Sequence, residues 1–132
     1  KGIIGIVNQT SGNYASVLSI LYRDLKINAK FIKSNVFGSL FWQGDNPNEM
    51  QLSDIVSINV VEIGDTLVTG GMSSYFPEDI PIGKVKSFEL LENGGYYDIS
   101  VSLFNNMTDL EYVYVIGNKD RGEIIELLER EP

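Results

Sequence analysis

Alternating apolar and polar residues run through much of the chain, and this pattern predicts β-strands. The alternation has no miss at residues 97–103, so one face of that strand is expected to be buried and the other to face water. The Asn-Gly step at 93–94 suits a turn that needs a positive φ, and residues 82–90 fit a partner strand. Residues 82–103 are therefore predicted to form a β-hairpin.

Further strands are predicted where β-branched and aromatic residues gather between clusters of Gly, Asn and Ser. These stretches are residues 3–7, 16–21, 27–33, 40–42, 58–61, 66–68 and 112–116. About ten short strands joined by turns predict a barrel or a sandwich, because a closed or doubled sheet leaves few unpaired edges. Residues 123–130 differ, since their apolar side chains follow a helical spacing, and a helix of that length is marginal by itself.

Composition narrows the chemistry that the chain can perform. Its 132 residues are enough for a buried core, and they include no cysteine and no histidine. Disulfides, zinc-thiolate sites, thiol nucleophiles and the usual general base are therefore excluded. The net charge of −8 would repel a phosphate backbone, so nucleic acid is not an expected partner. No apolar run approaches the ~18 to 20 residues that span a bilayer, and the start does not resemble an export signal.

Neither a catalytic site nor a metal or cofactor site is expected. The serines at 73–74 have no histidine to take a hydroxyl proton, and the second glycine of a nucleophile elbow is missing. A serine–lysine pair would need a buried lysine, for which Lys84 and Lys86 remain open. The acidic residues at 78–79 and within 45–49 lack the ligand spacing of a calcium loop, so solvated loop charge is their expected role.

Three stretches together resemble the signature of the MreC family of bacterial rod shape-determining proteins. They are residues 64–71 (GDTLVTGG), 75–77 (YFP) and 80–85 (IPIGKV). The family pattern runs G-D-x-V-x-T-S-G and then F-P-x-G-[IL]-P-[IV]-G-x-V, so this chain departs from the second element at Asp79, where the pattern has glycine. Stretches near both ends of the chain also resemble the opening and closing strands of the family, so the likeness covers about residues 2–116.

The signature also has a physical interpretation of its own. Gly64 can take a positive φ at a chain reversal while Asp65 accepts backbone N–H groups of the turn, which makes a sharp corner. Pro77 and Pro81 each fix their own φ, so the loop that contains them is stiffened at two points. The structural signature consists of Gly64, Asp65, Gly70, Pro77, Pro81 and Gly83.

The fold prediction is all-β, with two small β-barrel subdomains of the six-stranded type and a short C-terminal helical tail. The simplest division gives residues 1–63 to the first barrel, 64–118 to the second and 119–132 to the tail. The alternative arrangement has one barrel inserted in the other, with the first strand returning to pair with later strands.

The resemblance implies a non-enzymatic scaffold of the bacterial cell-elongation complex on the periplasmic side of the inner membrane. Family members are similar in forming dimers and filaments, and in linking the MreB cytoskeleton and MreD to class B penicillin-binding proteins. An N-terminal transmembrane helix, absent from this chain, would supply the membrane anchor. The alternative is a ligand-binding or adaptor β-barrel module of an envelope transport system, which would carry a concave apolar pocket with a few convergent polar groups.

Three aromatic residues are the candidates for binding a partner protein. Tyr75 and Phe76 are adjacent on the stiffened loop, although Phe76 could instead plug the end of a barrel. Phe41 belongs to a dense apolar cluster that could form either core or interface. If Leu40 and Trp42 face inward, strand alternation turns Phe41 outward.

Overall fold

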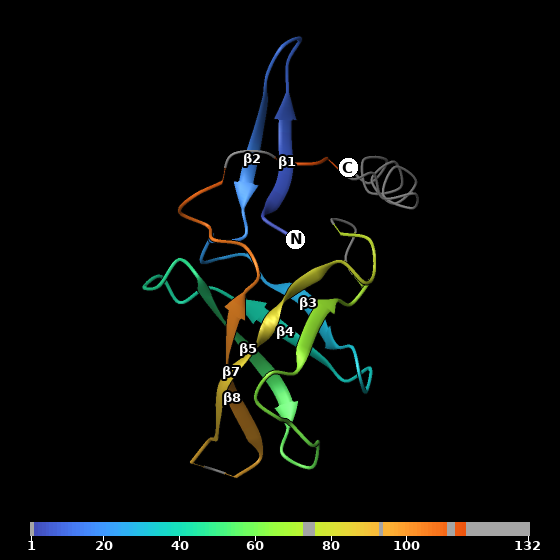
Figure 1. Cartoon of the computed structure of the whole chain (residues 1–132), viewed down its shortest axis with the longest axis vertical. Coiled ribbons are helices and arrows are strands. Elements are labelled where there is room, and N and C mark those ends of the chain that lie inside the picture. Colours follow the sequence, from blue (N-terminus) through green and yellow to red (C-terminus); the bar gives the residue numbers. More distant parts are fainter. Residues whose placement is uncertain (1, 73–75, 93, 111–112, 116–132) are drawn as a thin grey trace, which may run out of the picture.

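The computed structural model describes residues 2–72, 76–92, 94–110 and 113–115, and the elements within them are all strands. The strands are β1 (Gly5–Thr10), β2 (Ala15–Ser19), β3 (Ile27–Phe31), β4 (Phe37–Phe41), β5 (Glu49–Val56), β6 (Thr66–Thr69), β7 (Pro81–Leu90) and β8 (Tyr96–Leu103). β1 and β2 pair as a two-stranded sheet, whereas the other six close into an antiparallel barrel in the order β3-β4-β5-β8-β7-β6. Figure 1 shows the β1–β2 hairpin projecting from one end of the barrel.

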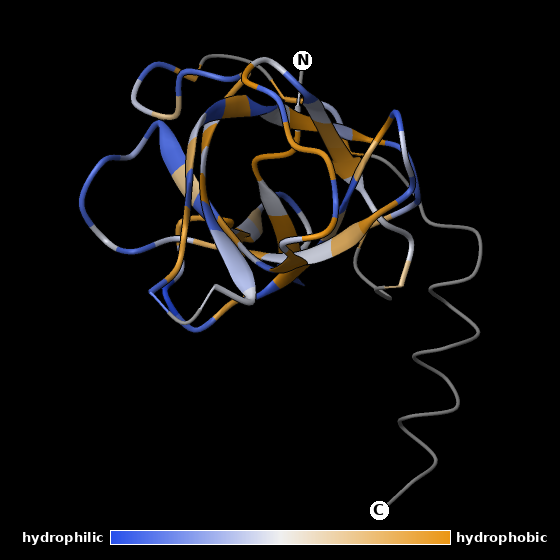
Figure 2. Ribbon diagram, turned by 90° about the horizontal axis from the view of Figure 1, so that it is seen from below, coloured by the Kyte–Doolittle hydropathy of each residue, from blue (hydrophilic) through white to orange (hydrophobic). Residues whose placement is uncertain are grey.

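Apolar side chains fill the interior of the barrel, as expected for a small closed sheet. The ring of strands is seen end on in Figure 2. Inward positions alternate with outward ones in β4 and in the first half of β5. The largest fully buried side chains include Phe31, Leu40, Met50, Leu52, Leu67, Ile82 and Ile99. Phe88 and Tyr97 pack against this core and make an edge-to-face contact whose ring centroids lie 5.6 Å apart.

The β1–β2 hairpin and the barrel share one continuous core. Ile3, Ile6 and Ile20 are buried in the same apolar cluster as the barrel interior. Hydrogen bonds fix the base of the hairpin, because the backbone N–H of Ile3 donates to the Pro81 carbonyl at 3.0 Å. The side-chain amide of Asn105 donates to the Gly2 carbonyl at 2.6 Å, so the segment after β8 also holds the start of the chain.

The domain arrangement differs from the sequence prediction. In the described part of the chain there is one closed barrel and one separate two-stranded sheet, in place of two barrels. The expected boundary between residues 63 and 64 falls between β5 and β6, which belong to the same barrel. The predicted helical tail at 119–132 lies outside the described residues. No helix in the described ranges has the length and hydropathy needed to cross a membrane.

The structure has no strand at two of the predicted positions that it describes, residues 58–61 and 113–115. Residues 58–61, predicted as a strand, form a turn and a loop in the structure, because Asn59 N–H donates to the Val56 carbonyl and reverses the chain there. The strand expected at 112–116 lies partly outside the described residues, and residues 113–115 have no strand structure. The predicted hairpin at 82–103 is present as β7 and β8.

Candidate partner-binding surface

The Gly64-Asp65 corner has the geometry expected from the signature. Gly64 has φ of 93°, in the left-handed region that favours glycine. The Asp65 carboxylate accepts the backbone N–H of Glu62 at 2.8 Å. Backbone N–H groups of Gly64 and Val85 bond to the Val85 and Asp65 carbonyls, respectively, which ties the corner to β7. β6 begins directly after the corner, at Thr66.

Lys33 connects this corner to the β3–β4 turn. Its Nζ lies 2.9 Å from a carboxylate oxygen of Asp65 and 3.2 Å from one of Glu62. The hydrogen bond to Asp65 is the main cause that raises the pKa of Lys33 above its ordinary value of 10.5. Since Lys33 and Glu62 are 29 residues apart, one ammonium group holds two loops together that the sequence separates widely.

A second, more buried lysine anchors the loop of residues 70–80, called here the signature loop. Lys30 on the outer face of β3 is 7% exposed, and its Nζ pairs with the carboxylates of Glu78 and, at 3.0 Å, of Asp79. Both carboxylates remain more than half exposed, so water screens the pairs on one side. The pKa of Lys30 is raised above its ordinary value of 10.5. The hydrogen bond to Glu78 is the largest cause, and the hydrogen bond to Asp79 is the second largest.

Thr69 fixes the path of the signature loop at its base. Its buried hydroxyl donates to the Pro77 carbonyl at 2.6 Å and accepts the Ile80 N–H at 2.9 Å. Asp79 N–H donates to the Thr69 carbonyl at 3.0 Å. The sequence prediction did not single out Thr69, although its place in the signature between a strand and a glycine pair was the available signal. A methyl group at Gly70 would run into the Asn28 side chain, so the loop also needs glycine at its start.

The departure from the family pattern at Asp79 has a structural counterpart. Asp79 has φ of 69°, a conformation that costs most non-glycine residues about 1 kcal/mol. Asp tolerates this region better than most residues, and here its carboxylate also pairs with Lys30. The ion pair therefore compensates part of the backbone strain that glycine would avoid.

Substitutions at Asp79 should separate the strain from the ion pair. Asp79→Asn retains tolerance of the positive φ but removes the charge, so a lower melting temperature is expected. Asp79→Gly removes the charge and also relieves the strain, so it should melt above Asp79→Asn. Thermal unfolding of both variants at neutral pH measures the difference. An Asn variant as stable as the parent would show that the pair with Lys30 contributes nothing.

The raised pKa values of Lys30 and Lys33 predict that the fold becomes less stable at alkaline pH. Their pKa values are raised in the folded protein, so their ion pairs stabilise it below the ordinary lysine value of 10.5. This contribution is lost as the pH rises through the higher folded-state pKa values. The melting temperature, followed from about pH 8 to about pH 12, should fall less steeply in Lys30→Met than in the parent chain. Equal slopes would contradict the assignment.

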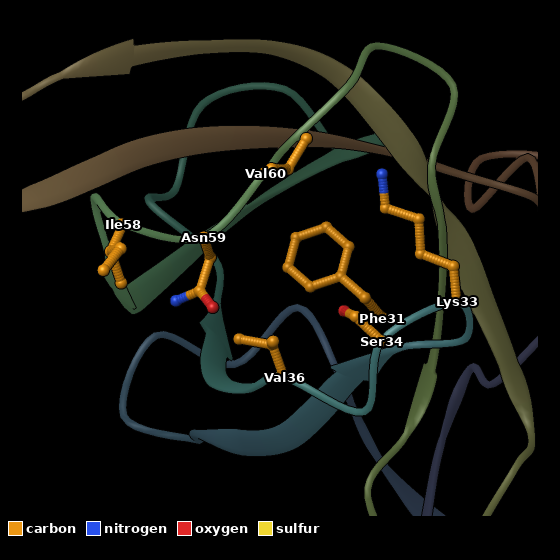
Figure 3. Close-up of a pocket in the computed structure, with 7 residues that line it drawn as sticks. All are labelled: Phe31, Lys33, Ser34, Val36, Ile58, Asn59 and Val60. Atoms are coloured by element: carbon orange, nitrogen blue, oxygen red, sulfur yellow. The ribbon is translucent and has the colours of Figure 1, made fainter.

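A pocket of about 320 Å³ opens between two surface loops (Figure 3). Phe31 and Val36 come from the end of β3 and the turn after it, and Ile58 and Val60 come from the loop after β5. The remaining lining residues are polar: Lys33, Ser34 and Asn59. The pocket thus combines an apolar floor with one ammonium group and two small polar side chains at its edge.

Two of the three residues predicted to bind a partner, Phe76 and Phe41, lie within the part of the chain that the structure describes. Phe76 is 6% exposed and belongs to the core cluster, so its ring packs inside the molecule. Phe41 is half-buried at the end of β4, next to the inward-facing Leu40. Tyr75 lies outside the described residues. Sequence reasoning missed the most exposed apolar side chains of the barrel loops, Ile58 at 86% and Val60 at 73%, because it assigned them to a strand.

Residues considered for chemistry do not form a reactive group in the described part of the chain. Lys84 and Lys86 are exposed, and Lys86 pairs with Glu49 at 2.7 Å. The buried lysine is Lys30, which is held by two carboxylates. The serines at 73–74 lie outside the described ranges. Within those ranges no three acidic side chains come close enough together to hold a metal ion.

Comparison with known families is decisive for the identity of this barrel. The family described as rod shape-determining protein MreC, barrel core, matches residues 1–117. The chain belongs to the MreC family. MreC proteins are cell shape-determining, and the signature at 64–85 lies within the matched range.

Individual MreC proteins agree with this assignment. The chain is 28% identical over 75 residues to the cell shape-determining protein MreC of Escherichia coli K12, a match that covers 57% of this chain and 20% of that protein. The crystal structure of MreC from Pseudomonas aeruginosa has the same fold, with a TM-score of 0.77 at 21% identity over 84% of this chain and 71% of that one. The chain thus matches about a fifth of the length of the Escherichia coli protein.

A third relative is known in a complex. The structure of a complex between penicillin-binding protein PBP2 and MreC from Helicobacter pylori contains a chain with a TM-score of 0.59 to this one, at 18% identity over 77% of this chain and 62% of that chain. At this identity the likeness is one of fold.

Proposed function

We propose that this chain is the extracytoplasmic, non-catalytic part of a scaffold in the cell-elongation complex. It binds a class B penicillin-binding protein and further copies of itself on the periplasmic side of the inner membrane. Through these contacts it links the MreB cytoskeleton and MreD to peptidoglycan synthesis. A transmembrane anchor, which the resemblance implies, is part of this proposal.

The observation that supports it most is an MreC barrel whose interior is filled while large apolar side chains stand exposed on its loops. Contiguous exposed apolar surface on a soluble domain is typical of a protein-binding site. The complex of PBP2 with MreC from Helicobacter pylori is a precedent for the class of partner.

The transport-module alternative has less support. A ligand-binding barrel would hold its ligand in a concave interior with convergent polar groups. In this chain the barrel interior is packed with side chains, and the pocket at Phe31 opens between surface loops. The geometry therefore favours contacts with another protein over capture of a small molecule.

Binding to the penicillin-binding protein of the same organism tests the proposal directly. The immobilised periplasmic domain of that enzyme should bind the chain saturably, and photo-crosslinkers at Tyr75 or Phe41 in cells should test both candidates as contact positions. Sedimentation velocity over a hundredfold concentration range measures self-association. A chain that binds no penicillin-binding protein and stays monomeric throughout would oppose the scaffold function.

A further inference from the structure

The pocket at Phe31 is flanked by unusually exposed β-branched side chains. Ile58 is 86% exposed, Val60 is 73%, Ile63 is 72% and Ile32 is 60%. All four lie on the two loops that enclose the pocket or directly beside them. Exposing so much apolar surface in one place is unfavourable in water, at roughly 25 cal/mol per Å². A cluster of this kind around a hollow indicates a surface that a partner covers.

Contacts within the chain already hold the walls of the pocket in position before any partner binds. Asn59 donates from its backbone and from its side chain to the Val56 carbonyl, both at 3.0 Å, which fixes the turn that carries Ile58. Lys33 ties the opposite loop to Glu62 and Asp65. Because the walls are already ordered, a bound side chain would cost little further conformational entropy.

The charge around the pocket selects among possible occupants. Lys33 is balanced by two carboxylates, and the Glu62 side chain is 70% exposed, so the rim carries an excess of negative charge. The whole chain has a net charge of −8. A second copy would bring the same negative charge to this face, whereas a segment with lysine or arginine complements it.

We infer that this pocket binds one large apolar side chain, such as leucine or phenylalanine, from a segment of a partner protein in which lysine or arginine flanks that side chain. The apolar side chain lies over Phe31 between Val36 and Val60 (Figure 3). The basic groups face the exposed carboxylate of Glu62. This inference rests on the proposed function in taking that partner to be the penicillin-binding protein. Asp65 is then a positioning residue, because it holds Lys33 and caps the loop without contacting the partner.

The double variant Ile58→Ser/Val60→Ser tests the pocket, since both side chains are exposed and their loss should leave the fold intact. Affinity for the periplasmic domain of the penicillin-binding protein should fall about tenfold or more, as for side chains at the centre of an interface. A matched control is Tyr14→Ser/Val17→Ser on the β1–β2 hairpin, where the side chains are 81% and 52% exposed. The control should bind within about twofold of the parent. Glu62→Lys should also weaken binding and flatten its salt dependence.

Peptide probes separate this inference from the proposed function. In NMR titrations Lys-Lys-Phe-Lys-Lys should shift amides at residues 31–36 and 58–62, whereas Lys-Lys-Ala-Lys-Lys and Glu-Glu-Phe-Glu-Glu should not. If the enzyme binds equally well to the double variant, the pocket inference is overturned and the proposed function stands. If the enzyme never binds but the basic phenylalanine peptide does, the inference survives without that partner. Dimers that the double variant abolishes would overturn it in favour of a second copy.

Discussion

Replacing Gly83 by alanine is expected to destabilise the barrel by about 3 kcal/mol, because the added methyl group has no room. Gly83 is buried in β7 between Leu67 of β6 and Leu103 of β8. A Cβ there would overlap the Ser102 carbonyl oxygen and lie 3.0 Å from the Leu103 Cα. Both are backbone atoms of the neighbouring strand, so β8 would have to move away from β7. Urea-induced unfolding gives the free energy directly.

Gly12 provides the matched control for this substitution. It lies in the turn between β1 and β2, and a Cβ there would meet no atom within 4 Å. Its φ is not among the positive values, so alanine is compatible with its backbone. Gly12→Ala should change stability by less than about 0.5 kcal/mol and is expected to raise it, because alanine restricts the unfolded chain. If the two variants were equally stable, the close approach of β7 and β8 would not be the reason that position 83 requires glycine.

The sequence predicted the regular part of the barrel well and its irregular part poorly. Residues 97–103 of β8 alternate without interruption and an Asn-Gly step precedes them, so period and turn chemistry both indicated a hairpin. β5 was not predicted, because its alternation is broken. Met50 and Leu52 point inward, but the register shifts before Ile55, and Asp54 has φ of 70°. A bulge moves the buried positions by one residue, and a search for strict period two then fails.

The simplest domain division, a cut before Gly64, runs through the six-stranded barrel. A glycine corner such as Gly64 is an equally good signal for the end of a domain and for a turn inside one. Only the pairing of β3 with β6, between residues far apart in sequence, shows that the barrel closes across that corner. Long-range pairing is not encoded in local propensity, so the sequence alone does not settle it.

The candidate site shows the same division between local and long-range information. Positive φ at Gly64 and hydrogen bonding by Asp65 follow from residue types in a turn, and both were predictable. The pocket at Phe31 was not, since its two walls come from loops that Lys33 joins over 29 residues. Burial of Phe76 was left open, because an aromatic residue beside a proline is typical of both a plug and an exposed loop.

Phe76→Ala should therefore act on stability, with a loss of about 3 kcal/mol in the free energy of unfolding. Phe76 is 6% exposed within the same core cluster as the barrel interior, so truncation leaves a cavity that the surrounding strands fill only in part. Phe104→Ala is the control, since Phe104 is 38% exposed and its loss should cost about 1 kcal/mol. Urea unfolding measures both, and affinity for the penicillin-binding protein is measured on the folded fraction of each. A Phe76 variant that keeps its stability but loses that affinity would make this ring a partner contact and not a plug.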